Sequence, residues 1–335
     1  MVPRRHRLQH PAPQWRADRQ SGLYALVARA ILIGGGTVFA AAFIRGWLAA
    51  GNEIAEIWCG KSGPLARAQR TATQWAPNWS VHRLAERHGL PVFRNEPLKK
   101  WGEGASERAS ALDADTLVTC VTMQIVPRAL IEHFAGRAVN FHPAMLPAYR
   151  GPSPLLGVLI DGVGHLYSGV TLHELSPGID EGAIIAQRPV VADGADRRHQ
   201  SWMVRLAEAV DCMARDELPA FLGGRRGSVA QSGGTYRRVR EEAGLGPHLT
   251  FEAATRVVER AGASGRISAA SRAVKAPLRR LSDPTGAPPV RGPLAIDIDL
   301  ADARVRVARW TPLDAGLGKL DMLREMRAAD RRRQE

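Results

Sequence analysis

The sequence predicts an α/β fold: a Rossmann-like, mostly parallel sheet flanked by helices, with a small appended C-terminal domain. Three observations support this. Residues 30–59 read as strand, glycine turn, helix and strand, which is a βαβ unit and implies a parallel sheet. Further short apolar runs alternate with helical patterns up to residue 224. After Gly234 the composition becomes rich in Arg and Ala, which indicates a change of domain.

The elements of the larger domain follow from apolar runs and their punctuation. Gly51 marks the end of the first helix, since glycine tolerates the left-handed conformation that follows many helices. The predicted elements, in chain order, are a strand (30–33), a glycine turn (34–36), a helix (38–50), a strand (53–59), a helix with a short strand (80–93), a strand (116–121), a helix from about 127, a strand (138–142), two strands (168–175 and 183–190) and a helix (201–224).

The C-terminal part has fewer signals. A helix is predicted over 251–262, with Thr250 as its N-cap. The segment 279–293 is rich in Pro, Gly and Arg and predicts a linker or long loop, and clear alternation then predicts a hairpin. We therefore divide the chain into a disordered basic N-terminal extension (1–29), a catalytic domain (30–230) and a small C-terminal domain with a basic, partly disordered end (231–335).

Composition restricts the class of protein. Of 335 residues, 45% are hydrophobic and 24% charged, which is ordinary for a soluble globular protein. No apolar run reaches the roughly 18 residues that span a bilayer, so we expect a cytoplasmic protein without a membrane partner. Cys59, Cys120 and Cys212 are far apart, which argues against a disulfide framework and a cysteine zinc site, and no metal is expected. The oligomeric state stays open.

The net charge of +13 is concentrated at the two ends of the chain. Residues 1–30 contribute +5, residues 31–250 only +2, and residues 251–335 contribute +6. A basic terminus can hold a phosphate backbone, because binding releases condensed counterions. The same charge also suits a solvated surface in an arginine-rich protein, and we favour that interpretation.

The glycine turn brings the backbone close to a ligand or simply closes a tight turn. Gly34 and Gly35 are therefore candidate substrate-binding residues. A nicotinamide site is disfavoured, because Phe39 stands where the third glycine of a G-x-G-x-x-G fingerprint would be. No acidic residue is well placed for a ribose hydroxyl either.

The segment NFHPAMLPAYRG (140–151) combines polar chemistry with backbone constraint at the end of a strand. Asn140 and His142 are two residues apart and so lie on one face, at the sheet edge where α/β proteins bind ligands. A histidine exchanges protons near neutral pH, and an amide can stabilise a developing oxyanion. The alternative is a histidine that only caps the strand.

A carboxylate follows 38 residues after His142, in the turn SPGIDEG. Asp180 in that turn would orient the imidazole and favour its protonated form. Asn, His and Asp at neighbouring strand ends suit transfer of an acyl-level group. Because no serine or cysteine stands in an elbow motif, direct transfer to an external nucleophile is favoured over a covalent intermediate.

Together, NFHPAMLPAYRG and SGVTLHELSPGIDEGAIIAQ resemble the folate-dependent formyltransferase family over about residues 30–225. The family includes methionyl-tRNA, glycinamide ribonucleotide and amino-sugar N-formyltransferases. The resemblance implies that Asn140, His142 and Asp180 are catalytic and that 10-formyltetrahydrofolate is the co-substrate. It also implies two sets of binding residues. The folate set is Val121, Thr122, Met123, Gln124, Ile125, Val126, Ser176, Pro177, Gly178 and Ile179, and the further substrate-binding candidates are Arg150, Gly151 and His173.

The implied mechanism is attack of an acceptor amine on the formyl carbon, with Asn140 and protonated His142 stabilising the tetrahedral intermediate. Asp180 would support proton transfer. Ala144 and Glu181 depart from the family's usual pattern.

Several acceptors and one non-enzymatic role remain open. A small amine such as a nucleotide-linked amino sugar is the preferred acceptor, because the residues of both motifs resemble the amino-sugar N-formyltransferases more than the other members of the family. Methionyl-tRNA is the alternative, favoured by the basic C-terminal region. Water, which would make the protein a 10-formyltetrahydrofolate hydrolase, and a non-catalytic folate-binding protein are less favoured.

Overall fold

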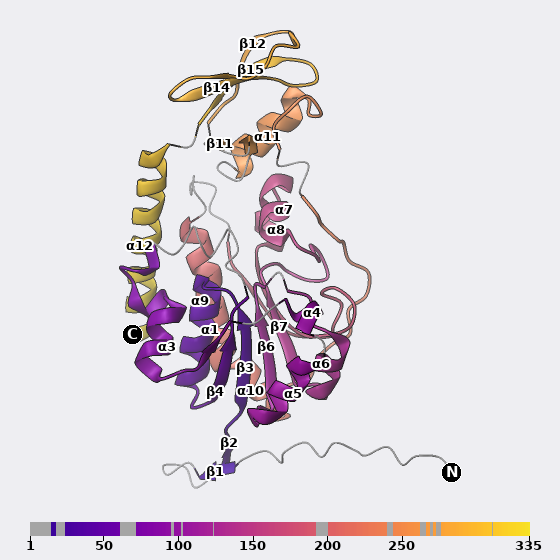
Figure 1. The fold of residues 1–335 in the computed structure, drawn as a ribbon, viewed down its shortest axis with the longest axis vertical. Helices are drawn as coiled ribbons and strands as arrows, with labels where there is room; N and C mark the ends of the chain where they lie inside the picture. The colour runs from indigo at the N-terminus through magenta and orange to yellow at the C-terminus, as the bar shows by residue number, and fades with distance from the viewer. Residues whose placement is uncertain are drawn as a thin grey trace, which may run out of the picture.

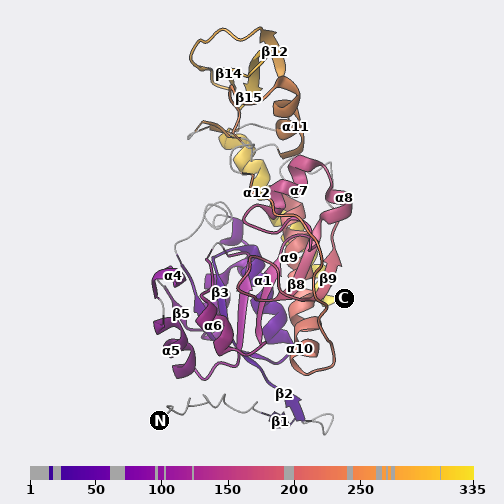
Figure 2. The same cartoon turned by 90° about the vertical axis from the view of Figure 1, so that its right-hand side faces the viewer.

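The computed structural model describes residues 15–17, 24–60, 72–94, 97–101, 103–122, 124–191, 200–239, 244–261, 266–268, 271–272, 276–309 and 311–335. A seven-stranded sheet forms the centre of the larger unit, in the order β5-β4-β3-β6-β7-β8-β9 (Figures 1 and 2). Strands β5 to β7 pair in parallel, and β8 and β9 are antiparallel additions at one edge. The predicted mostly parallel α/β sheet is confirmed.

The strands of this sheet lie close to their predicted positions. Their bounds are β3 Arg29–Gly34, β4 Glu53–Trp58, β5 Val92–Phe93, β6 Thr116–Cys120, β7 Ala138–His142, β8 Gly169–Glu174 and β9 Ile184–Pro189. The helices and one 3-10 turn of the larger unit are α1 Val38–Ala49, η1 Pro77–Trp79, α3 Val81–His88, α4 Leu98–Trp101, α5 Gly104–Ala111, α6 Arg128–His133, α7 Pro154–Asp161, α8 Gly164–Tyr167, α9 Gln200–Arg215 and α10 Glu217–Leu222.

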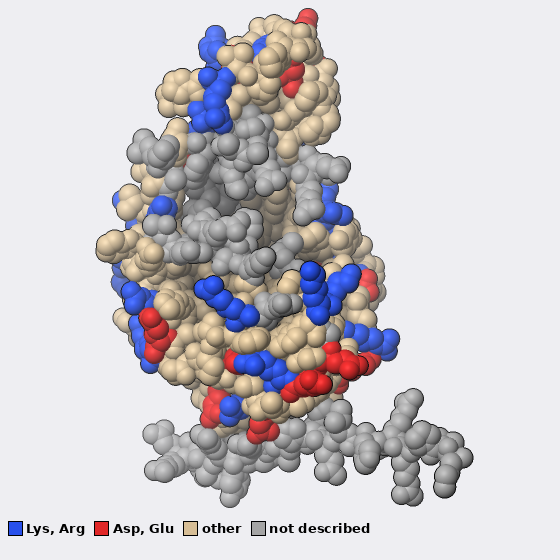
Figure 3. Space-filling view, viewed as in Figure 1, with Lys and Arg blue, Asp and Glu red and all other residues tan. Residues whose placement is uncertain are grey.

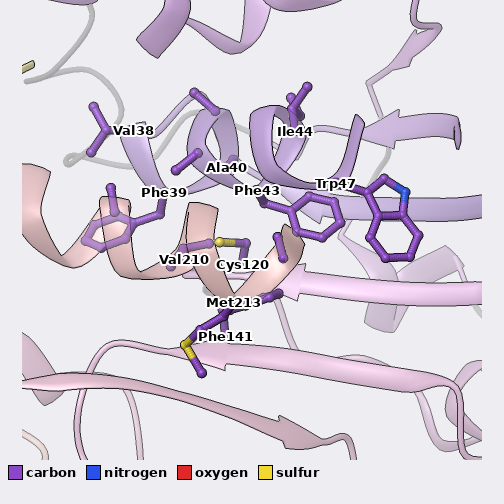
Figure 4. Close-up of a cluster of buried hydrophobic side chains, with 14 of the residues drawn as sticks. Val38, Phe39, Ala40, Phe43, Ile44, Trp47, Cys120, Phe141, Val210 and Met213 are labelled. Atoms are coloured by element: carbon purple, nitrogen blue, oxygen red, sulfur yellow. The ribbon is translucent and has the colours of Figure 1, made fainter. Parts of the chain in front are cut away.

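One face of the sheet is covered by α1 and α9, and α4 to α6 cover the other (Figure 1). Helix α1 is apolar nearly all round, so it is buried between the sheet and α9. Figure 4 shows Phe43 of this helix facing Phe141 of β7, with ring centroids 5.8 Å apart. This packing holds β7 against α1 through Phe141, while the polar residues Asn140 and His142 alternate with it along the strand.

The predicted helix 201–224 is wrong as a single element, because α9 ends at Arg215 and α10 begins at Glu217. Pro219 explains the break. In a continuous helix its ring would clash with the carbonyl of Arg215, and it has no N–H to donate.

The C-terminal unit has a second core, formed by a four-stranded antiparallel sheet and a helix. The helix α11 (Phe251–Ala261) confirms the prediction, and the Ala253 N–H donates to Thr250 Oγ1 (3.2 Å), as expected for its cap. The hairpin is also confirmed. The sheet has the order β12-β15-β14-β13, with bounds β12 Arg279–Ser282, β13 Val290–Arg291, β14 Ala295–Asp299 and β15 Arg304–Ala308.

The prediction of a linker or long loop over 279–293 is therefore wrong in part, since the segment contains β12 and β13. Both are short edge strands whose side chains are exposed, so no apolar alternation marks them. Two small further strands, β10 (Arg266–Ser268) and β11 (Ser271–Arg272), pair with each other.

The two ends of the chain differ from the sequence-based expectation. The last residues form α12 (Pro312–Gln334), which leaves the small unit and packs along α9 (Figure 1), burying Met322, Met326 and Ala329 in the main core. Within the N-terminal extension, β1 (Trp15–Ala17) and β2 (Tyr24–Leu26) pair antiparallel. Residues 27–29 of the predicted disordered extension are also ordered, since Ala28 is buried and Arg29 begins β3, whereas residues 1–14 and 18–23 lie outside the described residues. The predicted boundary near 230 stays a prediction.

No helix among the described residues is long and apolar enough to cross a bilayer.

Candidate active site

The carboxyl end of β7 lies beside the amino end of β8, and strand register places three polar side chains in one row. Thr119 of β6 pairs with Asn140 of β7, and Asn140 pairs with His173 of β8. Directly paired residues in neighbouring strands share a face of the sheet. The alternation of β7 then puts His142 on that same face, as the sequence predicts.

Asn140 is oriented by partners on both sides. The Thr119 hydroxyl donates to Asn140 Oδ1 (2.7 Å). His173 Nδ1 lies 2.8 Å from the carbonyl of Glu174, so that nitrogen carries the hydrogen and His173 Nε2 accepts from Asn140 Nδ2 (3.0 Å). The second Nδ2 hydrogen is directed toward Asp180 Oδ1, at a longer 3.4 Å. This is the hydrogen that a substrate oxygen can receive.

His142 has its tautomer set by a backbone carbonyl. Its Nε2 lies 2.9 Å from the Tyr149 carbonyl oxygen, which can only accept, so Nε2 carries a hydrogen. Nδ1 then faces Asp180 Oδ2 at 3.5 Å. Burial lowers the pKa of His142, and the Asp180 carboxylate and the Tyr149 carbonyl oppose that shift. At neutral pH His142 is therefore a neutral imidazole whose free nitrogen lies beside a carboxylate that would stabilise an added proton.

The Asp180 carboxylate is aimed by the turn that carries it. Its backbone has a left-handed φ of 55°, and the Gly151 N–H donates to Asp180 Oδ2 (2.8 Å). Gly182 closes the same turn against β8, where a Cβ would lie 1.8 Å from the Glu174 carbonyl oxygen. Only glycine fits there, which accounts for the Asp-x-Gly spacing.

His173 is buried beneath Asn140, with 1% of its surface exposed. Burial lowers its pKa to about 4, and the neighbouring His142 adds to the shift. A neutral ring is needed for His173 Nε2 to accept from the Asn140 amide. The geometry thus makes His173 a positioning residue for Asn140, and direct contact with substrate stays a prediction.

The loop between β7 and α7 is held by residues that the sequence analysis did not identify. Thr171 Oγ1 donates to the Ala144 carbonyl (2.7 Å) and accepts from the Leu146 N–H (3.0 Å). Gln187 Nε2 donates to the Leu146 carbonyl (2.7 Å). The β7–β8 register brings Thr171 opposite His142, and only the strand pairing could have revealed that.

The remaining predicted residues are distributed as follows. The segment 121–126 begins where β6 ends, next to β7, and Met123 lies outside the described residues. Residues 176–179 form the turn between β8 and β9, with the Ser176 hydroxyl donating to the Gly178 carbonyl (3.2 Å). Gly151, which follows Arg150, donates its N–H to Asp180 Oδ2. Gly34 ends β3 and Gly35 follows it, and β6 separates β3 from β7.

Comparison with known proteins gives one consistent family. Residues 30–210 match the family model described as formyl transferase. The methionyl-tRNA formyltransferase of Citrifermentans bemidjiense is 31% identical over 187 residues, which is 54% of this chain and 56% of the relative. That of Chloroflexus aggregans is 36% identical over 143 residues, 43% of each chain. The chain spans about half the length of these curated relatives.

Among solved structures, a sugar 3N-formyl transferase with dTDP and 5-N-formyl-THF has a TM-score of 0.54 at 15% identity, covering 85% of this chain and 98% of that one. The N-formyltransferase of Helicobacter canadensis, in complex with folinic acid and dTDP-3-aminofucose, has a TM-score of 0.52 at 14% identity, with 84% and 99% covered. At these identities the likeness concerns the fold.

Proposed function

The chain belongs to the formyl transferase family of one-carbon transferases, and we propose that it moves the formyl group of 10-formyltetrahydrofolate to the amino group of a nucleotide-linked amino sugar. The observation that carries the proposal is the convergence of Asn140, His142 and Asp180 within hydrogen-bonding or ion-pair distance. A neutral imidazole beside a carboxylate, next to an oriented amide donor, is suited to proton transfer during attack on a carbonyl.

Asn140, His142 and Asp180 would each have a separate role in the reaction. The Asn140 Nδ2 hydrogen that now faces Asp180 would donate to the formyl oxygen as it gains negative charge. His142 Nδ1 would accept the proton that the amine loses, and Asp180 would stabilise the resulting imidazolium. The proton then moves to the leaving nitrogen, so the amine hydrogen replaces the formyl group there. His142 is neutral before the reaction and protonated during it.

The residues around the trio fit a folate. A pterin has flat apolar faces and a polar edge, and the two segments implied for it offer both kinds of surface. Ile125 and Ile179 are 67% and 49% exposed, and they lie in the segments that follow β6 and precede Asp180. Residues 121–126 and 176–179 would therefore hold the ring. When bound, the folate supplies the formyl group as an activated amide.

Two observations favour a small acceptor. The sugar 3N-formyl transferase and the N-formyltransferase bound to dTDP-3-aminofucose share this fold over more than four-fifths of this chain. The basic C-terminal region is also partly neutralised within the molecule. Its ion pairs include Arg304–Asp299, Arg306–Asp297, Arg332–Glu208 and Arg333–Asp211. Such arginines are less available to a phosphate backbone than isolated ones.

Methionyl-tRNA is the second candidate acceptor, because the matched relatives that share 31% and 36% identity are methionyl-tRNA formyltransferases. The small unit also carries a stripe of basic side chains on the face shown in Figure 3, whereas basic and acidic side chains are interspersed over the larger unit.

The test is release of tetrahydrofolate from 10-formyltetrahydrofolate with buffer, methionylated initiator tRNA or a mixture of nucleotide-linked amino sugars. Turnover with the sugars alone supports the proposal. Turnover with tRNA alone transfers it to the second candidate, and equal turnover in buffer would make the protein a hydrolase. No release under any condition would contradict formyl transfer.

A further inference from the structure

We infer that Gln231 is a positioning residue for Asp180: its side-chain amide fastens the turn that carries Asp180 to the loop that carries Gly151. The inference rests on the proposed function for its catalytic consequence, and on geometry alone for its effect on His142. Gln231 lies in the segment 229–237, outside the motifs that the sequence analysis identified and just beyond the domain boundary predicted near 230.

The Gln231 amide uses its hydrogen-bonding capacity on both sides. Its Nε2 donates to the carbonyls of Asp180 (3.0 Å) and Gly182 (2.6 Å). Its Oε1 accepts from Arg150 Nε (3.2 Å) and Nη2 (2.8 Å). A guanidinium only donates and a carbonyl only accepts, so the chemistry of these partners also fixes which end of the amide is oxygen.

These contacts close a ring around the carboxylate. Gly151, the residue after Arg150, donates its N–H to Asp180 Oδ2 (2.8 Å). Gln231 therefore contacts both sides of that hydrogen bond. It accepts from the side chain of Arg150, which directly precedes the donor Gly151, and it donates to the backbone carbonyl of Asp180. Without the amide, the Asp180 turn would lose the two hydrogen bonds that its carbonyls at Asp180 and Gly182 accept from Gln231.

The segment that carries Gln231 is itself anchored at both ends. The N–H and carbonyl of Val229 exchange hydrogen bonds with Ile184 at 2.8 Å each, which fixes the segment to β9. At the other end, the Arg150 N–H donates to the Thr235 carbonyl (2.9 Å), and the Arg237 N–H donates to the Arg150 carbonyl (2.8 Å). Tyr236 packs over Gly151, where a Cβ would lie 2.7 Å from its ring.

The consequence for catalysis follows from the charge on Asp180. That carboxylate lies 3.5 Å from His142 Nδ1 and acts to raise the pKa of His142 against the effect of burial. If the turn shifts outward, His142 loses this support and holds a proton less well. Loss of the Gln231 amide should therefore lower the pKa of His142 and slow proton transfer, although Gln231 touches no reacting atom.

The test compares Gln231→Met with Gln187→Met. Both replacements keep side-chain length and remove an amide that donates to loop carbonyls, but Gln187 binds the Leu146 carbonyl and Thr171 rather than the Asp180 turn. The His142 signal is assigned in 13C-histidine-labelled protein by its disappearance in His142→Asn, and it is titrated by NMR in each variant. A Gln231→Glu variant keeps the acceptor for Arg150 and loses both donated hydrogen bonds.

We expect a lower His142 pKa in Gln231→Met than in the wild type and a smaller shift in Gln187→Met, which leaves the Asp180 turn intact. In tetrahydrofolate release, kcat should fall by about 10-fold to 100-fold with a smaller change in KM for the folate, as misplacement of a catalytic group predicts. Gln231→Glu should lose activity as Gln231→Met does.

An unchanged His142 titration in folded Gln231→Met, or an equal shift in Gln187→Met, would overturn the inference. Wild-type protein that releases no tetrahydrofolate would instead contradict the proposed function, and the titration would still decide the role of Gln231.

Discussion

Two buried polar clusters in this molecule show how differently proteins use buried charge. Under α12, Arg45 of α1 lies 3.2 Å from Asp211 of α9 and 3.3 Å from Asp330 of α12, and Arg333 also pairs with Asp211. Two cations and two anions thus balance. In the candidate active site, by contrast, Asp180 faces two neutral imidazoles, and no arginine or lysine among the described residues forms an ion pair with it. His142 would supply the positive charge opposite Asp180 when it accepts a proton.

The comparison teaches that burial of a charged group does not by itself mark a catalytic site. Burial raises the pKa of Asp211 and lowers that of Arg45, yet each of these shifts is opposed by a fixed ion-pair partner. Burial lowers the pKa of His142, and the Asp180 carboxylate and the Tyr149 carbonyl oppose that shift, so a neutral ring lies beside a group that would stabilise an added proton. The first cluster joins α12 to the main unit, and the second is available for chemistry.

The largest expected effect is on catalysis. Replacing His142 with Ala removes the proton acceptor, and transfer should fall by roughly 10²-fold to 10⁴-fold. Folate binding should survive, because the predicted ring-binding segments 121–126 and 176–179 are unchanged. Single-turnover kinetics and equilibrium binding of a stable folate measure the two separately. Unchanged transfer would remove His142 from the mechanism.

The second effect concerns stability. Asp211→Ala leaves Arg45 buried with fewer anionic partners, and breaking a buried ion pair in this way costs about 3–5 kcal/mol. Urea denaturation should show that loss, while kcat of the protein that remains folded stays near the wild-type value. Asp330→Ala serves as the graded control, since its side chain is 27% exposed and should cost less. A large fall in kcat with unchanged stability would reverse the roles assigned to the two clusters.

The third prediction concerns the pH dependence of folding stability, which His173 in the candidate active site should control. The pKa of His173 is lowered from its ordinary 6.5 to about 4. Between pH 6.5 and pH 4, His173 is therefore protonated in the unfolded chain but neutral in the folded protein. This contribution to stability is complete above pH 6.5 and is lost as the pH falls toward 4, by an amount on the order of 3 kcal/mol. His173→Gln should flatten the stability profile in this window. An equally steep profile in that variant would place the titration elsewhere.

The smallest effect is expected from the exposed charges of the C-terminal unit. Exposed ion pairs are worth about 0–1 kcal/mol, so replacing Arg306, which pairs with Asp297, should change stability little. If tRNA is not the acceptor, Arg306→Gln should also leave tetrahydrofolate release with amino sugars unchanged. A steep salt dependence of tRNA binding that weakens in Arg306→Gln would favour the second candidate.

Much of this architecture could be predicted from local pattern. The glycine turn, the apolar strands and the Thr250 cap each carry a short-range signal, and the structure has them where the sequence puts them. Helix α12 also carries a local signal at its start. Thr311 and Asp314 form a capping box with Pro312 at the first helical position, but the Arg-rich composition obscured it.

The candidate site was predicted less completely, because its supporting contacts are long-range. Asn140, His142 and Asp180 stand out by residue type and spacing. Thr119 and Gln231, however, are unremarkable residues until strand register and the crossing of segment 229–237 bring them to Asn140 and Asp180. Hydrogen bonds between residues 21 and 51 positions apart leave no mark on the sequence near either partner.

The most direct test of formyl transfer follows the formyl carbon itself. Protein is mixed with 10-formyltetrahydrofolate carrying 13C in the formyl group and with a nucleotide-linked amino sugar, and the label is followed by NMR. We predict that the label appears in a formamide on the sugar nitrogen, and that His142→Ala abolishes its appearance. Label that remains on the folate, or that is released as formate whether or not the sugar is present, would contradict the account.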